Sequence, residues 1–292
     1  MPSNAGCHDS DKMIMQSADR MAFGGPQVPS QLLLGGYVVY SCADGDFELT
    51  VDGTTRVCRY MEIVPPYTKH SVTGPANLRS ILVEAETVSP EILKDGRFSG
   101  GQGAELAKRI DHGFENWKAG RFDSGLDSFD LFFFGERLPL RNLDSRVVHV
   151  VGRILDTMDD TPIEVSTLAQ DVSLSPSRLR HLFCEQVGVS IRSFRAWKRL
   201  RNTICLALEE TNLLELAMAA GYADSTHFCH SVKLYFGEQP TFVRSHWRDS
   251  DFLQLPSSEF PVPCHPANDR LGEARDEDNV GASKPPVDNL GS

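Results

Sequence analysis

The chain has 292 residues, of which 40% are hydrophobic and 24% charged, and its formal net charge is −11. This composition is typical of a globular protein of roughly two domains and argues against a disordered chain. No run reaches the ~18 apolar residues that a membrane span requires, and the N-terminus lacks the layout of a signal peptide. The seven cysteines form no Cys-x-x-Cys pair, so free thiols in a reducing cytoplasm are expected.

The N-terminal half is expected to be rich in strands. Residues 1–28 are polar without a sustained period, and we expect them to form a flexible arm. Residues 29–136 begin with short runs of β type, joined at Val51-Asp52-Gly53 by a hairpin signal. They predict a compact barrel whose interior positions are Leu33, Val38, Phe47, Leu49, Tyr60 and Ile81.

A helical pair is predicted after the strands. Apolar residues recur at helical spacing over 103–118, and the apolar segment 128–134 follows a short break. We expect this pair to pack with its apolar face on the barrel or on a second copy of the chain.

The C-terminal half is expected to be helical. Residues 137–143 are predicted to be a linker, and a helix is expected to begin at Asp144 or Ser145. Helical patterns continue to residue 248. Residues 249–292 are rich in Pro, Ser, Gly and acids, which predicts a disordered acidic tail.

Two stretches of the helical half resemble each other, 168–194 and 216–243. Each combines a short helix carrying Leu-Ala, a tight turn, and a second helix with a polar face, as in a helix-turn-helix. Gly221 stands where such a turn requires a positive φ. The second helices are expected to start at Ser175, followed by Pro176, and at Asp224 or Ser225.

Residues 144–248 resemble the DNA-binding domain of the AraC/XylS family of transcription regulators. The motifs that carry the resemblance are "LAQDVSLSPSRLRHLF", "VGVSIRSFRAWKRLR", "LAMAAGYADSTHF" and "FGEQPTFVR". It implies a long helix near 193–208 that separates two helix-turn-helix units, which enter successive major grooves of double-stranded DNA ~34 Å apart. The half before it is similar to the cupin-like effector and dimerisation domain of that family.

The fold class that follows is multidomain α and β. It combines an N-terminal cupin-like β-barrel and helical hairpin with a C-terminal all-α double helix-turn-helix domain. Carried over by position, the resemblance implies DNA contacts from Ser177, Arg180, His181, Ser225, Thr226, His227, His230 and Lys233. Arg180 is the candidate for a bidentate contact to guanine. The family commonly has Arg where His230 stands and Phe where Val232 stands, so weaker contacts are expected from the second unit.

The acidic chain holds one basic segment, which suits contact with a phosphate backbone. Between 178 and 201 a single acid, Glu185, stands among seven cations: Arg178, Arg180, Arg192, Arg195, Lys198, Arg199 and Arg201. Two interpretations remain open for Arg192, Arg195 and Arg199: they pair with acids, or they contact phosphates.

Metal and cofactor chemistry is not expected. His227 and His230 share a helix face, but no further ligand has a familiar spacing. His70 lies where metal-binding cupins place strand histidines, yet their His-x-His set is missing. Tyr60 and His70 are therefore only candidates for contact with an effector.

The sequence thus predicts a cytoplasmic, homodimeric transcription activator that binds promoter DNA and a small-molecule effector, and is not an enzyme. RNA polymerase is a further partner that the resemblance implies, and no membrane partner is expected. Two alternatives stay open: a cupin-type metal enzyme fused to a regulatory domain, and a regulator whose N-terminal domain only dimerises.

Overall fold

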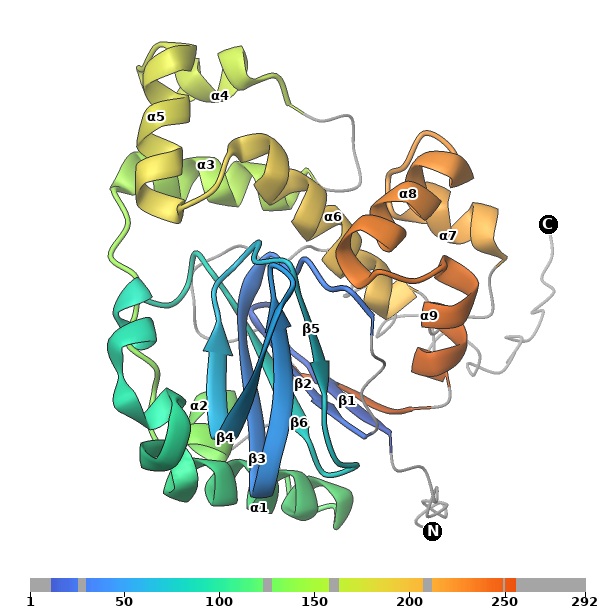
Figure 1. The fold of residues 1–292 in the computed structure, drawn as a ribbon. Helices are drawn as coiled ribbons and strands as arrows, with labels where there is room; N and C mark the ends of the chain where they lie inside the picture. Colours follow the sequence, from blue (N-terminus) through green and yellow to red (C-terminus); the bar gives the residue numbers. More distant parts are fainter. Residues whose placement is uncertain are drawn as a thin grey trace, which may run out of the picture.

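The computed structural model describes residues 12–25, 30–122, 128–157, 163–206, 212–248 and 250–255. A strand-rich half is followed by a helical half (Figure 1). The strands are β1 (Met13–Gln16), β2 (Arg20–Gly24), β3 (Gly36–Val51), β4 (Thr54–Val64), β5 (His70–Thr73), β6 (Arg79–Glu84) and β7 (Asp251–Gln254). They form one sheet in the order β4-β3-β6-β2-β1-β7, with β5 paired to β3.

The sheet is open, which corrects the predicted barrel. β4 and β7 are the two ends of the strand order, and among the described strands these two do not pair with each other. The positions expected in one interior divide between two buried clusters, with Val38, Phe47 and Leu49 in one and Ile81 in the other. Successive side chains of a strand point to opposite faces. Because helices cover both faces here, apolar residues are buried on both sides although the sheet does not close into a barrel.

The expectation of a flexible arm over 1–28 is wrong for residues 13–16 and 20–24, which form β1 and β2. β1 pairs with β2, and β2 pairs with β6. Met15 and Ala22 in these strands are fully buried. β7 pairs in parallel with β1, so the expectation of a disordered tail over 249–292 is wrong for residues 251–254. Such short strands carry too little alternation to be found from a sequence period, and the β2–β6 and β1–β7 pairings join residues that are distant in the chain.

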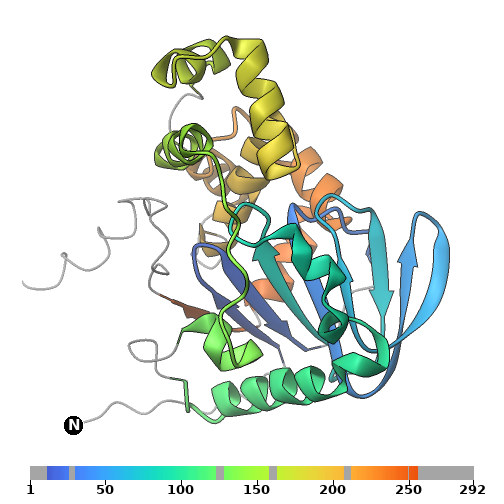
Figure 2. The same cartoon turned by 90° about the vertical axis from the view of Figure 1, so that its left-hand side faces the viewer.

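The predicted helical pair is present and packs on the sheet. It consists of α1 (Ala104–Lys118) and α2 (Phe129–Phe134), preceded by 3-10 turns at Pro90–Lys94, Gly96–Phe98 and Gly100–Gly103. Figure 2 shows α1 running along the lower edge of the sheet. Phe114 of α1 and Phe133 of α2 are fully buried with ring centroids 5.1 Å apart. The apolar face is therefore covered within the chain.

Seven helices follow in the described part of the C-terminal half. They are α3 (Ser145–Asp156), α4 (Val165–Asp171), α5 (Pro176–Val187), α6 (Ile191–Leu206), α7 (Leu213–Ala219), α8 (Ser225–Phe236) and α9 (Pro240–Arg248). The predicted caps are confirmed. Asp144, Ser175 and Asp224 each accept a hydrogen bond from a main-chain N–H of the first turn, at 2.9, 3.2 and 2.7 Å. Each cap satisfies a donor that the helix leaves unpaired.

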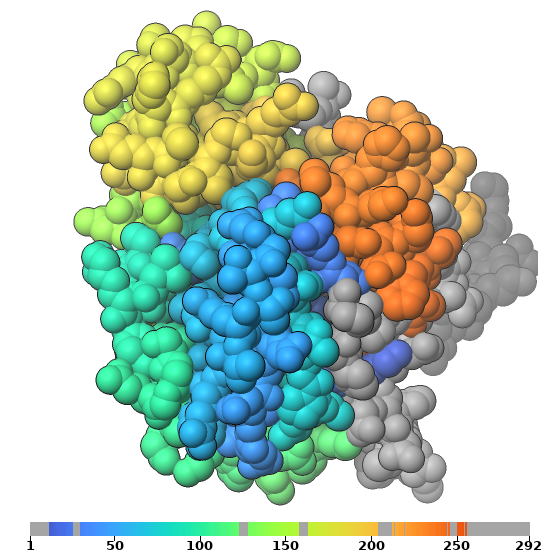
Figure 3. Space-filling view, viewed as in Figure 1, coloured from blue at the N-terminus to red at the C-terminus, as the bar shows by residue number. Residues whose placement is uncertain are grey.

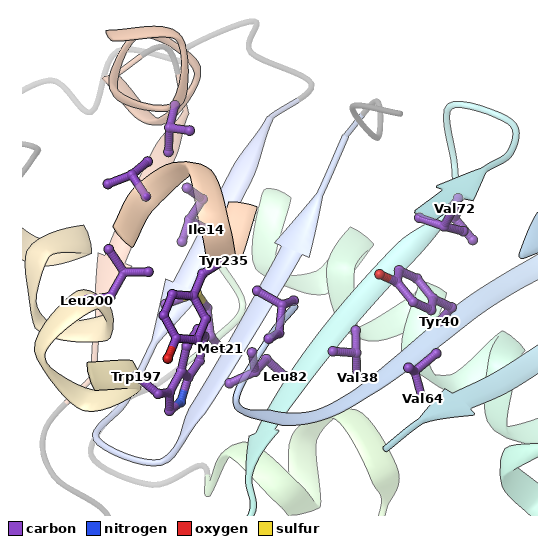
Figure 4. Close-up of a cluster of buried hydrophobic side chains, with 14 of the residues drawn as sticks. Ile14, Met21, Val38, Tyr40, Val64, Val72, Leu82, Trp197, Leu200 and Tyr235 are labelled. Carbon is purple, nitrogen blue, oxygen red and sulfur yellow. The ribbon is translucent and has the colours of Figure 1, made fainter. Parts of the chain in front are cut away.

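The buried apolar residues form three clusters that do not follow the two halves of the chain. One covers the α1 side of the sheet, and one lies within α3, α4, α5 and the start of α6. The third, here called the interdomain core, joins the other sheet face to α6, α7, α8 and α9. Figure 4 shows part of it, with Trp197, Leu200 and Tyr235 lying over Ile14 and Met21. The last helices are therefore packed on the sheet, whereas α3 to α5 have a core of their own.

Candidate nucleic-acid interface

Two helix-turn-helix units lie at the two ends of α6, the first formed by α4 and α5 and the second by α7 and α8 (Figure 1). Figure 3 shows them as two lobes, the first (yellow) above the sheet domain and the second (orange) beside it. Each turn has one residue in the left-handed region at the equivalent position, Ser173 at φ 53° in the first and Gly221 at φ 73° in the second. The positive φ expected at Gly221 is confirmed. The repeat seen in the sequence is thus a repeat of backbone geometry.

Replacement of Gly221 by alanine is expected to lower the free energy of unfolding by about 1–2 kcal/mol, because a Cβ in the left-handed region is strained. Thermal unfolding of the full chain measures this loss. Gly101→Ala is the matched control, since a Cβ there meets nothing within 4 Å and its φ is not positive. Equal effects of the two substitutions would contradict the proposed role of the turn.

The solvent-facing side of α5 carries the residues expected to contact DNA from the first unit. Ser177, Arg180 and His181 are all exposed. Their neighbours Leu179 and Phe183 are fully buried against α3, α4 and α6. The helix is held by one face and presents the other, which is the arrangement that entry into a major groove requires.

The second recognition helix, α8, is arranged in the same way. Its inner face is held by Phe228, Val232 and Tyr235, all buried in the interdomain core. The residues expected to contact DNA lie outside: Thr226, His227, His230 and Lys233 are exposed and Ser225 is half-buried. Lys233 is the single Lys or Arg of this helix. Weaker phosphate contact from the second unit thus stays our expectation.

Two cations of the basic segment, Lys198 and Arg201, belong to a buried group that we call the interdomain ion cluster, which also includes Glu84, Glu86 and Trp197. The Lys198 ammonium lies 2.8 Å from the Glu84 carboxylate and also pairs with Glu86. Arg201 Nε and the Trp197 indole N–H each donate to Glu84 at 2.9 Å. All five side chains are buried. These two cations hold α6 on the end of β6 and are not available to a phosphate.

The remaining cations of α6 differ in whether they have a partner within the described part of the chain. Arg195 donates to the carbonyl of Ile163, and the guanidinium of Arg199 lies 5.5 Å from the Tyr222 ring centre. Arg192 is exposed. Of the two interpretations left open by the sequence, contact with phosphate therefore fits Arg192 best.

Burial and the opposite charges of the interdomain ion cluster shift the pKa values of Glu84, Glu86 and Lys198. Burial alone would raise the pKa of Glu84, but Lys198 and Arg201 outweigh it and lower that pKa below 4.5. Burial and the nearby Glu84 carboxylate raise the pKa of Glu86 and outweigh the opposing effect of Lys198. Burial opposes the charge of Lys198, yet the two carboxylates raise its pKa above 10.5.

The two candidate effector contacts do not meet. His70 is buried with both ring nitrogens engaged, Nε2 at 2.8 Å from the Tyr40 hydroxyl and Nδ1 at 2.7 Å from the Thr68 carbonyl. Burial lowers the pKa of His70, which favours the neutral ring. Tyr60 packs against the opposite cluster, at φ 62° and under the Arg59 guanidinium. Both ring nitrogens of His70 thus have partners within the chain, and its contact with an effector stays a prediction.

Neither a metal centre nor a membrane span is found in the described ranges. No group of three or more His, Cys, Asp or Glu there is placed to hold a metal ion. No helix among the residues from 12 to 255 that the structure covers has the length and apolarity to cross a bilayer.

Comparison with known proteins identifies the helical region. Residues 168–246 match the family model of a helix-turn-helix domain. The arabinose operon regulatory protein of Salmonella typhimurium is 32% identical over 104 residues, which cover 35% of this chain and 37% of that protein. The Msm operon regulatory protein of Streptococcus mutans is 26% identical over 116 residues, 37% of this chain and 42% of that protein. The chain thus matches less than half the length of these curated relatives.

Among solved structures, ToxT from Vibrio cholerae has a TM-score of 0.47 and 12% sequence identity. The likeness covers 82% of this chain and 98% of ToxT. Residues 168–246, which match the family model, include both recognition helices and the two turns that precede them. The C-terminal region of this chain is therefore an AraC-type helix-turn-helix domain, as its sequence motifs predicted.

Proposed function

We propose that the protein is a cytoplasmic transcription regulator that binds specific promoter sites and responds to a small-molecule effector. The observation that carries this proposal is the pair of recognition helices at the two ends of α6, each buried on one face and polar on the other. The relatives that match this region are named as operon regulators. Activation through RNA polymerase and homodimerisation belong to the same proposal.

The first test is retention of fragmented genomic DNA by the purified chain at ~150 mM salt with competitor DNA, followed by sequencing. Salt is fixed because phosphate contacts make affinity salt-dependent. We expect a few sites with two sequence blocks about one helical turn apart. Uniform retention, or none with and without a metabolite extract, would overturn the proposal.

Arg180→Ala is expected to weaken binding to the recovered site by about 1–3 kcal/mol and to relax the preference at one base pair. Lys233→Ala is expected to weaken binding to all sequences alike and to reduce the salt slope by about 1. Fluorescence anisotropy across a salt series separates the two effects. Arg56→Ala, at an exposed arginine of β4, should leave affinity unchanged. Loss of affinity without loss of base preference in the Arg180 variant would exclude base readout by this residue.

A further inference from the structure

A cavity of about 130 Å³ lies between the sheet and the second helix-turn-helix unit. Its sheet side comes from β1, β2, β3 and β6, with Ile14, Phe23, Val38 and Leu82 among the lining residues. Phe236 at the end of α8 and Phe242 and Val243 in α9 close the other side. Figure 4 shows Ile14, Val38, Tyr40 and Leu82 on the strands that form this side.

The chain around this cavity joins the two halves directly. The Leu33 N–H donates to the Tyr235 carbonyl at 2.9 Å, and the Ser30 hydroxyl donates to Glu238 at 2.8 Å. Gly237 ends α8 at φ 72°, and a Cβ there would lie 2.6 Å from the Gln31 carbonyl oxygen. The turn after α8 is therefore closely apposed to the segment that leads into β3.

Polar groups in the lining are few, and one of them is charged. Tyr40 lines the cavity, but its hydroxyl is engaged by His70. Ser30, Ser80 and Ser250 are neutral, so Glu238 is the single charged side chain among the described lining residues. An ionised carboxylate accepts hydrogen bonds and donates none. Its favoured partner is a cationic donor, since charge-assisted hydrogen bonds are stronger than neutral ones.

We infer that this cavity binds a small molecule with an apolar body and a protonated amine, the amine pairing with Glu238. The apolar body would contact the sheet and α9, and an anionic head group would be repelled at the same place. This inference rests on the proposed effector control and names the chemical class of the effector. Because the ligand would touch the sheet and the second unit together, its binding favours the packed position of α8 and α9.

The test compares three ligands that share one apolar body: 4-phenylbutylamine, 4-phenylbutan-1-ol and 4-phenylbutanoic acid. Calorimetric titration of the full chain without DNA gives their affinities. We expect the amine to bind at least tenfold more tightly than the acid. Glu238→Gln should reduce the amine's affinity to that of the alcohol, and Glu238→Lys should reverse the order in favour of the acid.

Glu48→Gln is the matched control, because Glu48 is an exposed carboxylate of β3 outside the cavity lining. It should leave all three affinities unchanged. Leu82→Phe should weaken all three ligands by filling the cavity; if that variant fails to fold, the charge reversal at Glu238 still decides. Equal binding of the three ligands, preference for the acid, or no binding by any of them would overturn the inference. Failure here leaves DNA retention intact, whereas failure of the proposed function removes DNA retention without affecting these titrations.

Discussion

Replacement of Glu84 by alanine is expected to lower the free energy of unfolding by about 3–5 kcal/mol, because it leaves buried cations without their anion. Glu84 is fully buried and is the shared partner of Lys198, Arg201 and Trp197. Glu86 still pairs with Lys198, but no described contact supplies Arg201 with another carboxylate. Urea unfolding of the full chain, followed by fluorescence, measures the loss.

Glu91→Ala is the control for this prediction. Glu91 pairs with Lys94 on the surface, where both side chains are largely exposed. Such pairs contribute about 0–1 kcal/mol, because water and salt screen them. A loss at Glu84 no larger than that at Glu91 would show that the interdomain ion cluster does not hold the two halves together.

Glu84→Ala should also change how the free energy of unfolding depends on pH in the acid range. Because the folded pKa of Glu84 lies below 4.5, its stabilisation is fully present above about pH 4.5 and decreases as the pH falls through the folded pKa. Glu86 acts in the opposite sense: its raised pKa makes its contribution decrease as the pH rises from about 4.5. Glu84→Ala should therefore show a shallower loss of stability on acidification than the parent chain.

Trp197→Ala is expected to cost about 3–5 kcal/mol, the range for removing a large aromatic side chain from a packed core. The indole is buried in the interdomain core, with its ring centroid 5.7 Å from that of Tyr235. A Cβ at Gly35 would overlap it, so the main chain of the sheet domain lies directly against the ring. Loss of the indole thus leaves a cavity between the sheet and the second unit.

Thermal unfolding and limited proteolysis test this prediction together. We expect the second helix-turn-helix unit to become more readily cleaved, while α3 to α5, which have their own core, keep their protection. Trp117→Ala is the matched control, since Trp117 is only half-buried on α1. Equal protection of both units in the Trp197 variant would contradict a shared core between the sheet and α8.

The local features of the helical half could be predicted from the sequence. The caps at Ser175 and Asp224, the left-handed turn at Gly221 and the inward position of Phe183 and Phe228 all depend on residues within one or two helical turns. A helix satisfies its main-chain hydrogen bonds internally, so its period and its ends are recorded in neighbouring residues. The exposed face that carries Arg180 follows from the same spacing.

Only the tertiary structure determined which residues make contact between the strand-rich half and the helical half. The sequence by itself determined two helix-turn-helix units, a strand-rich half and a basic segment, but it left open where the cations of that segment would point. Lys198 and Arg201 pair with Glu84, which lies more than 110 residues away in the chain, and Glu238 accepts a hydrogen bond from Ser30 in the lining of the cavity. Likewise, β7 is a strand because it pairs with β1, more than 230 residues earlier in the chain. Such contacts depend on which surfaces the folded chain brings together, and no local period records them.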